Sequence, residues 1–203
     1  MNEEITIDVP DPDALLMLRF KGGDSGAFEQ LFLRHTRAMV NFAYRFVRNR
    51  EVAEEMAQEI FLRVYEASAG YEPQAKFTTW LYRVATNVCL NEVRKPHFQA
   101  MHQSVPAAPR EDQEPTVFEP KTGDAAGRHL ERQAIARAIK EALEQIPLKQ
   151  RMAFILNKYQ ELSYAEVAEI MKVSEKAVKS LIHRAKETLA EKLKPLLSGL
   201  LNI

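Results

Sequence analysis

The chain has 203 residues, in which 28 Lys and Arg balance 28 Asp and Glu, and 46% of the residues are hydrophobic. That length suits one or two small domains, and the hydrophobic content excludes a chain that is disordered throughout. No apolar run approaches the roughly 18 residues of a membrane span, no signal peptide opens the sequence, and the single Cys89 excludes an intrachain disulfide. We therefore expect a cytoplasmic protein without membrane insertion, with Cys89 as a small buried hydrophobe.

The neutral total conceals an uneven distribution of charge. Residues 1–97 hold 12 Lys+Arg against 14 Asp+Glu, residues 98–125 hold 2 against 5, and residues 126–203 hold 14 against 9. The attraction of a protein to nucleic-acid phosphates grows with the number of phosphates it neutralises. A neutral chain should bind DNA weakly alone and gain affinity from a partner.

Helical periodicity organises the N-terminal part of the chain. After an acidic tail over 1–12, the pattern predicts four helices and no strand. They are a short helix over 13–21 ended by Gly22 and Gly23, a long one from Asp24 to about Arg48, a third over roughly 51–67, and a fourth from about Thr78 to Arg94.

The outer face of the predicted helix 51–67 carries alternating charges around one leucine. Its members are Glu54, Glu55, Gln58, Glu59, Leu62 and Arg63. Such a face is most often ordinary solvated surface, and the alternative is a docking face for a partner.

The predicted helix 78–94 has a polar row opposite its apolar face. Arg83, Asn87, Asn91 and Arg94 recur at spacings of three and four residues. Amide and guanidinium groups suit base edges and phosphates. Just before the row stand Lys76, Phe77, Thr78 and Trp80, and rings among cations suit the stacking of unpaired bases. The alternative interpretation places the two rings in the core and the polar row in water.

Residues 98–125 separate the two helical parts. They contain four of the ten prolines and few large apolar residues, which predicts a flexible acidic linker. The ends of such a coil would average about 30 Å apart and could extend to about 90 Å, enough for two domains to engage DNA sites about 70 Å apart.

The pattern returns to helix over 126–203. A helix before Pro147 and a second over 148–159 precede a helix-turn-helix candidate over 162–189. Ser163 and Glu166 form a predicted capping box, and Ser174 is a second N-cap. The second helix of the pair turns outward Lys176, Lys179, Ser180, His183, Arg184 and Lys186. A helix fits the DNA major groove, although a solvated charged face is the common alternative.

Nothing in the sequence indicates an enzyme. It has no phosphate-binding glycine loop and no Cys/His metal spacing, and its five histidines are scattered. We expect no catalytic residue, no metal, no cofactor and no small-molecule substrate.

Three stretches give the chain its resemblance to a known family. EVAEEMAQEIFLRVYE, FTTWLYRVATNVCLNEVRK and IPLKQRMAFILNKYQELSYAEVAEIMKVSEKAVKSLIHRAKETL occur in this order, with the proline-rich linker before the third. The chain thereby resembles the extracytoplasmic-function (ECF) group of bacterial RNA polymerase sigma factors, in the sigma-70 family. The resemblance implies an all-α protein with a region 2 domain over 13–97 and a region 4 helix-turn-helix domain over 126–203.

The resemblance also implies partners and roles. Core RNA polymerase would dock on the face of Glu55, Gln58, Glu59, Leu62 and Arg63. The −10 element of promoter DNA would be read and opened by Lys76, Phe77, Thr78, Trp80, Arg83, Asn87, Asn91 and Arg94, with a flipped base held by the Tyr71–Thr79 segment. The −35 element would be read by the second helix of the helix-turn-helix, and an anti-sigma factor would hold the protein inactive.

The sequence departs from the family pattern at five positions. Glu161 and Lys172 stand where members often have Gly, Ala177 where many have Thr, Leu181 where many have Arg, and Asn91 where many carry Asp. A usual phosphate contact is therefore missing at Leu181, and the −10 preference does not follow from the group.

Two other function classes remain at this point. A helix-turn-helix regulator would bind a palindromic duplex as a dimer without polymerase. A pure interaction module would show no salt-dependent DNA affinity at all. Capture by core polymerase separates both from a sigma factor.

Overall fold

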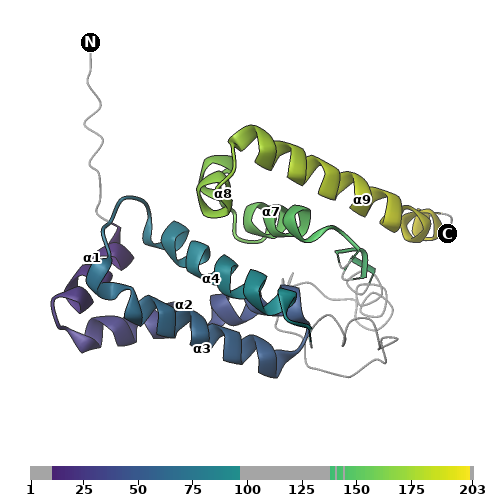
Figure 1. The fold of residues 1–203 in the computed structure, drawn as a ribbon. Helices are drawn as coiled ribbons and strands as arrows, with labels where there is room; N and C mark the ends of the chain where they lie inside the picture. The colour runs from purple at the N-terminus through teal and green to yellow at the C-terminus, as the bar shows by residue number, and fades with distance from the viewer. Residues whose placement is uncertain (1–10, 97–137, 140, 144, 202–203) are drawn as a thin grey trace, which may run out of the picture. The chain divides into compact units, whose positions relative to one another are not determined.

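The computed structural model describes residues 11–96, 138–139, 141–143 and 145–201. Within these residues every regular element is a helix, which confirms the predicted all-α class (Figure 1). The chain divides into two compact units, an N-terminal and a C-terminal one. The linker 98–125, nearly all of the predicted tail and most of the predicted helix before Pro147 lie outside the described residues.

The N-terminal unit consists of four α-helices and one 3₁₀ turn. They are α1 (Pro12–Lys21), α2 (Ser25–Val47), α3 (Arg50–Glu66), η1 (Ser68–Gly70) and α4 (Phe77–Arg94). α2 packs against α1 and α3, and α4 packs against α2 and α3. The helix bounds differ from the predicted ones by at most one residue. α1 begins one residue early because the Asp11 side chain caps it and Pro12 suits the first turn.

Large apolar side chains fill the core of this unit. Phe42, Phe46 and Leu81 are fully buried or nearly so, and the rings of Phe42 and Tyr82 meet edge to face at 5.3 Å. Cys89 is also fully buried, as predicted, and burial raises the pKa of its thiol. A protonated, inaccessible thiol has no nucleophilic role.

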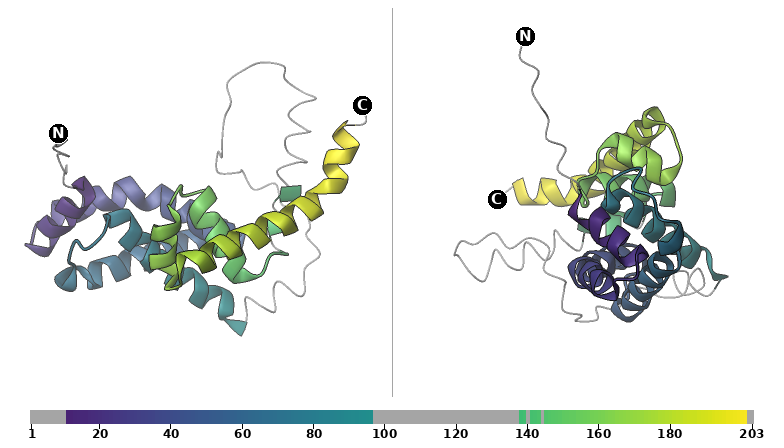
Figure 2. Two further views of the ribbon diagram at one scale, coloured as in Figure 1. Left: turned by 90° about the horizontal axis from the view of Figure 1, so that it is seen from above. Right: turned by 90° about the vertical axis from the view of Figure 1, so that its left-hand side faces the viewer.

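The C-terminal unit contains α7 (Leu148–Lys158), α8 (Tyr164–Met171) and α9 (Glu175–Leu201), and α9 packs against the other two (Figure 2). The predicted capping box is present. The amide N–H of Glu166 donates to Ser163 Oγ at 3.2 Å, and the amide N–H of Ser163 donates to the Glu166 carboxylate at 2.8 Å. Ser174 Oγ accepts from the Ala177 amide at 3.2 Å, so both predicted caps of the helix-turn-helix are confirmed.

Two of the positions that depart from the family pattern have an unusual backbone conformation. Glu161 lies just before α8 with φ of 55°, and Lys172 ends α8 in the left-handed region with φ of 54°. A Cβ atom makes this region unfavourable, whereas glycine adopts it without a steric penalty. The frequent glycines of the family at these positions therefore have a direct physical explanation, and this chain carries strain in their place.

We predict that Lys172→Gly stabilises the protein, raising the free energy of unfolding by about 0.5–1 kcal/mol, because relief of left-handed strain outweighs the greater freedom of the unfolded chain. Urea unfolding of the full chain measures the change. Lys179→Gly is the matched control, since it replaces an exposed lysine inside α9 and should destabilise by about 1 kcal/mol. Equal losses for both variants would contradict the strain argument.

Candidate nucleic-acid interface

The first surface of interest is the outer face of α9. Val178, Ile182 and Ala185 are buried in the unit, which turns the opposite side of the helix to solvent. All six predicted residues are exposed there, namely Lys176, Lys179, Ser180, His183, Arg184 and Lys186. His183 Nε2 lies 3.3 Å from the Glu187 carboxylate one turn on. The structure therefore brings five basic side chains and one hydroxyl onto one accessible side of the helix.

Leu181, where many members of the family carry Arg, is half-buried beside this surface. It contributes no charge, so the phosphate attraction of α9 rests on the neighbouring lysines and Arg184.

The second surface is a pocket at the start of α4. It has a volume of about 370 Å³ and lies between the segment after η1 and the first turns of the helix. Its lining includes Glu72, Gln74, Ala75, Trp80, Arg83 and Asn87. The pocket thus offers a half-exposed aromatic ring, a guanidinium and an amide, the three groups best suited to a nucleobase.

Three of the eight residues predicted for −10 DNA line this pocket: Trp80, Arg83 and Asn87. Four others lie outside the lining on the same helix or just before it. Of these, Lys76, Asn91 and Arg94 are exposed and Thr78 is half-buried. Glu72, Gln74 and Ala75 were not named individually from the sequence, although they lie in the Tyr71–Thr79 segment to which the resemblance assigns the flipped base.

Phe77 requires a correction. Its side chain is fully buried, and its ring lies 5.5 Å from that of His35 and 5.8 Å from that of Trp80, measured between centroids. A base cannot stack on a ring that has no exposed surface. Phe77 therefore supports the pocket from inside the core, as the alternative interpretation of its ring allowed.

Tyr71 packs against Trp80. The two rings meet edge to face with centroids 5.0 Å apart, and Tyr71 is only 2% exposed. Burial, followed by the negative charges of Asp11 and Asp13, raises the pKa of Tyr71 to about 12. The phenol is therefore neutral at physiological pH, so the ring that packs on Trp80 adds no negative charge that would repel a nucleic acid.

The third surface is the outer face of α3. Glu55, Gln58, Leu62 and Arg63 are exposed, and Glu59 is half-buried and accepts a 2.7 Å hydrogen bond from Arg63 Nε. Leu62 is 52% exposed, and the nearby Tyr65, which sequence analysis missed, is 55% exposed. Apolar groups among charges at helical spacing give a face that a protein partner can cover.

The part of the chain that the structure describes contains no group of three His, Cys, Asp or Glu side chains placed to hold a metal ion. None of its helices has the length and apolar character needed to cross a membrane.

Comparison with known families assigns both units. The model described as Sigma-70 region 2 matches residues 31–97, and the model described as Sigma-70, region 4 matches residues 136–189. RNA polymerase sigma-H factor of Pseudomonas aeruginosa is 30% identical over 194 residues, covering 92% of this chain and 96% of that protein. ECF RNA polymerase sigma factor SigW of Bacillus subtilis is 30% identical over 178 residues, covering 87% of this chain and 94% of SigW.

Solved structures show the same fold. CnrH, in complex with the cytosolic domain of CnrY, matches with a TM-score of 0.65 at 22% identity, covering 90% of this chain and 97% of CnrH. The sigma factor RpoE of Bartonella quintana, in complex with the anti-sigma factor NepR, matches with a TM-score of 0.59 at 23% identity, covering 82% of this chain and 96% of RpoE. With two region models in the expected order and 30% identity to proteins that it matches over nearly their whole length, this chain belongs to the ECF group of the sigma-70 family of RNA polymerase sigma factors.

Proposed function

We propose that this sigma factor divides promoter recognition among the three surfaces described above. The outer face of α3 binds core RNA polymerase, the pocket at the start of α4 captures an unpaired base of the −10 element, and α9 enters the major groove of the −35 element. The observation that carries the proposal is the pocket of about 370 Å³, whose lining includes Trp80, Arg83 and Asn87.

Base capture follows from the chemistry of the pocket. Extruding a base from duplex DNA costs a few kcal/mol, and stacking on an aromatic ring returns about 1–3 kcal/mol per base. The exposed amide of Asn87 can pair with the edge of the captured base, and the guanidinium of Arg83 supplies positive charge beside it. A pocket with these groups lowers the free energy of the opened promoter relative to the closed one.

Electrostatics explains why the polymerase is needed. Residues 1–97 have two more acidic than basic groups, so the unit with the pocket has no net attraction to the phosphates. Residues 126–203 have an excess of five basic groups, part of which lies on α9. We therefore propose that α9 supplies direct affinity for DNA, while the N-terminal unit reaches the −10 element because the polymerase holds it there.

The domain organisation belongs to the same proposal. A region 2 domain over 13–97 and a region 4 domain over 126–203 are joined by a linker over 98–125. The protein acts in the cytoplasm with the polymerase and has no catalytic residue of its own. Its similarity to CnrH and RpoE, which were solved with CnrY and with the anti-sigma factor NepR, supports control by an anti-sigma factor here. The relatives do not favour a dimeric regulator that works without polymerase.

We predict that substitutions in α9 and in the pocket fail at different steps. Lys179→Ala and Arg184→Ala should each weaken promoter binding about tenfold, because each removes a charged contact with the −35 duplex. Asn87→Ala and Trp80→Ala should instead slow opening, because a captured base loses its partner. Run-off transcription on duplex and pre-melted templates separates the two defects.

Pre-melting should rescue the pocket variants and leave the α9 variants impaired. Lys158→Ala and Gln30→Ala are the matched controls, since both remove exposed side chains of the same types on α7 and α2. Equal rescue of all four test variants would refute the division of labour.

We also predict that Leu62→Asp weakens binding to core polymerase at least tenfold without loss of folding, because a carboxylate would have to be desolvated in the interface. Fluorescence titration with core enzyme measures the dissociation constant. Leu33→Asp is the control, because Leu33 is 70% exposed on α2 and lies outside the proposed docking face. Identical affinities for the two variants would place the polymerase elsewhere on the surface.

A further inference from the structure

The segment that forms one wall of the pocket is tied at both ends to the first helix. Lys21 Nζ, at the end of α1, donates a 2.9 Å hydrogen bond to the carbonyl oxygen of Tyr71. Asp11 Oδ2, at the start of α1, accepts a 2.7 Å hydrogen bond from the amide N–H of Phe77. The pocket-lining residues Glu72, Gln74 and Ala75 lie between these two points. α1 therefore spans the pocket wall from one end to the other.

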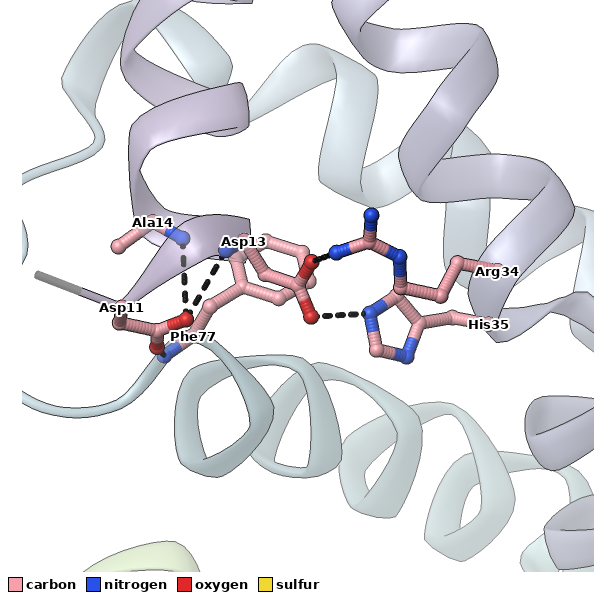
Figure 3. A network of polar contacts seen from close by, with 6 residues as sticks. All are labelled: Asp11, Asp13, Ala14, Arg34, His35 and Phe77. Carbon is pink, nitrogen blue, oxygen red and sulfur yellow. Dashed lines mark hydrogen bonds and ion pairs between the residues drawn. The ribbon is translucent and has the colours of Figure 1, made fainter.

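The Asp11 carboxylate caps two helices at once (Figure 3). Its Oδ1 accepts from the amides of Asp13 at 3.0 Å and Ala14 at 3.4 Å, which begins α1. Its Oδ2 accepts from Phe77, the first residue of α4, where the N-cap residue Lys76 makes no side-chain capping bond. The first amides of a helix lack partners within the helix and carry its positive dipole end, so a carboxylate is favoured at this point.

α1 is in turn fixed to α2. Asp13 Oδ1 pairs with the guanidinium of Arg34, and Asp13 Oδ2 lies 2.8 Å from His35 Nε2 (Figure 3). The side chains of Asp13 and His35 are only 13% and 12% exposed. The His35 ring also packs on Phe77. The helix that holds the pocket wall is therefore itself fixed in position by its ion pairs and packing with α2.

The hydrogen bonds within the pocket wall do not attach it to the helices. The amide N–H of Gln74 donates to the Glu72 carbonyl at 2.9 Å, and Gln74 Nε2 donates to the Glu72 carboxylate at 3.1 Å. Both bonds are local, and Glu72, Pro73 and Gln74 are exposed. They shape the turn without fixing it against Trp80 and Asn87.

We propose that Asp11 and Lys21 are positioning residues for base capture. They hold the pocket wall in its open geometry before DNA arrives, so that a base entering the pocket does not have to order the segment first. Ordering a segment on binding reduces affinity, and preorganisation removes that penalty. This inference rests on the proposed role of the pocket in −10 recognition, and neither residue contacts the base itself.

The test uses holoenzyme and a promoter that the wild-type protein transcribes, with the fluorescent base 2-aminopurine placed at each −10 position in turn. Asp11→Ser retains a cap for α1, because serine is a good N-cap, but its single short hydroxyl cannot also reach Phe77. Lys21→Met keeps the apolar stem and removes the donor to Tyr71. Loss of one charge-assisted hydrogen bond should slow the fluorescence rise of base capture about tenfold, with −35 binding and core affinity unchanged.

Arg19→Ala is the matched control, because Arg19 is a cation of the same helix whose ion pair with Asp24 stays within the α1–α2 turn. Lys21→Arg, which keeps a donor, should restore most of the rate. If Asn87→Ala slows capture and both tie variants behave like wild type, the positioning role is refuted and the pocket stands. If Asn87→Ala has no effect either, the proposed function of the pocket itself fails.

Discussion

The N-terminal unit depends on one carboxylate that serves two helix ends. Asp11 accepts from the first amides of α1 with one oxygen and from the first amide of α4 with the other. The positive ends of two helices are thereby brought to a single negative charge, which offsets their mutual repulsion and satisfies donors that have no partner within either helix. Because Trp80 and Asn87 lie one and three turns into α4, the start of this helix fixes where the pocket opens. The geometry of the pocket is thus set by a contact between segments 66 residues apart.

In the proposed function, the two units contact DNA by different physical means. α9 presents cations on a helix whose other side is buried, which gives attraction that weakens with salt. The pocket at the start of α4 offers a ring and an amide in a unit with no net positive charge, so it gains little from phosphates and acts only on a base that has left the stack. Such a site discriminates between opened and closed DNA, whereas α9 is suited to the closed duplex. In the same proposal, the outer face of α3, with Leu62 and Tyr65 exposed among charges, binds the polymerase and supplies the attachment that both modes require.

The sequence pattern predicted those features of the structure that depend on residues close together in the chain. The capping box of Ser163 and Glu166 involves residues three apart, and the exposed face of α9 follows from 3.6-residue periodicity. The contacts that complete the pocket join residues far apart in the chain, and helical periodicity cannot predict such contacts. Asp11 lay in the segment predicted as a tail, although it joins α1 to α4. The prediction that Phe77 contacts DNA is wrong because an aromatic residue next to Lys76 gives the same sequence pattern whether its ring is exposed or buried. Tertiary packing, in which the Phe77 ring lies against His35, Tyr71 and Trp80, decides between those orientations.

Both ties from α1 end on main-chain atoms, the carbonyl oxygen of Tyr71 and the amide nitrogen of Phe77. Hydrogen bonds to these main-chain atoms do not depend on which side chains the segment between Tyr71 and Phe77 carries. Glu72, Gln74 and Ala75 are therefore open to replacement without loss of the support from Asp11 and Lys21, as long as the turn itself is kept. In the proposed function, the residues that support the wall are therefore different from those that would contact the base. A few exposed side chains of the wall could then be replaced, changing which base the pocket prefers, while the start of α4 and the supporting rings of Tyr71 and Phe77 stay in place.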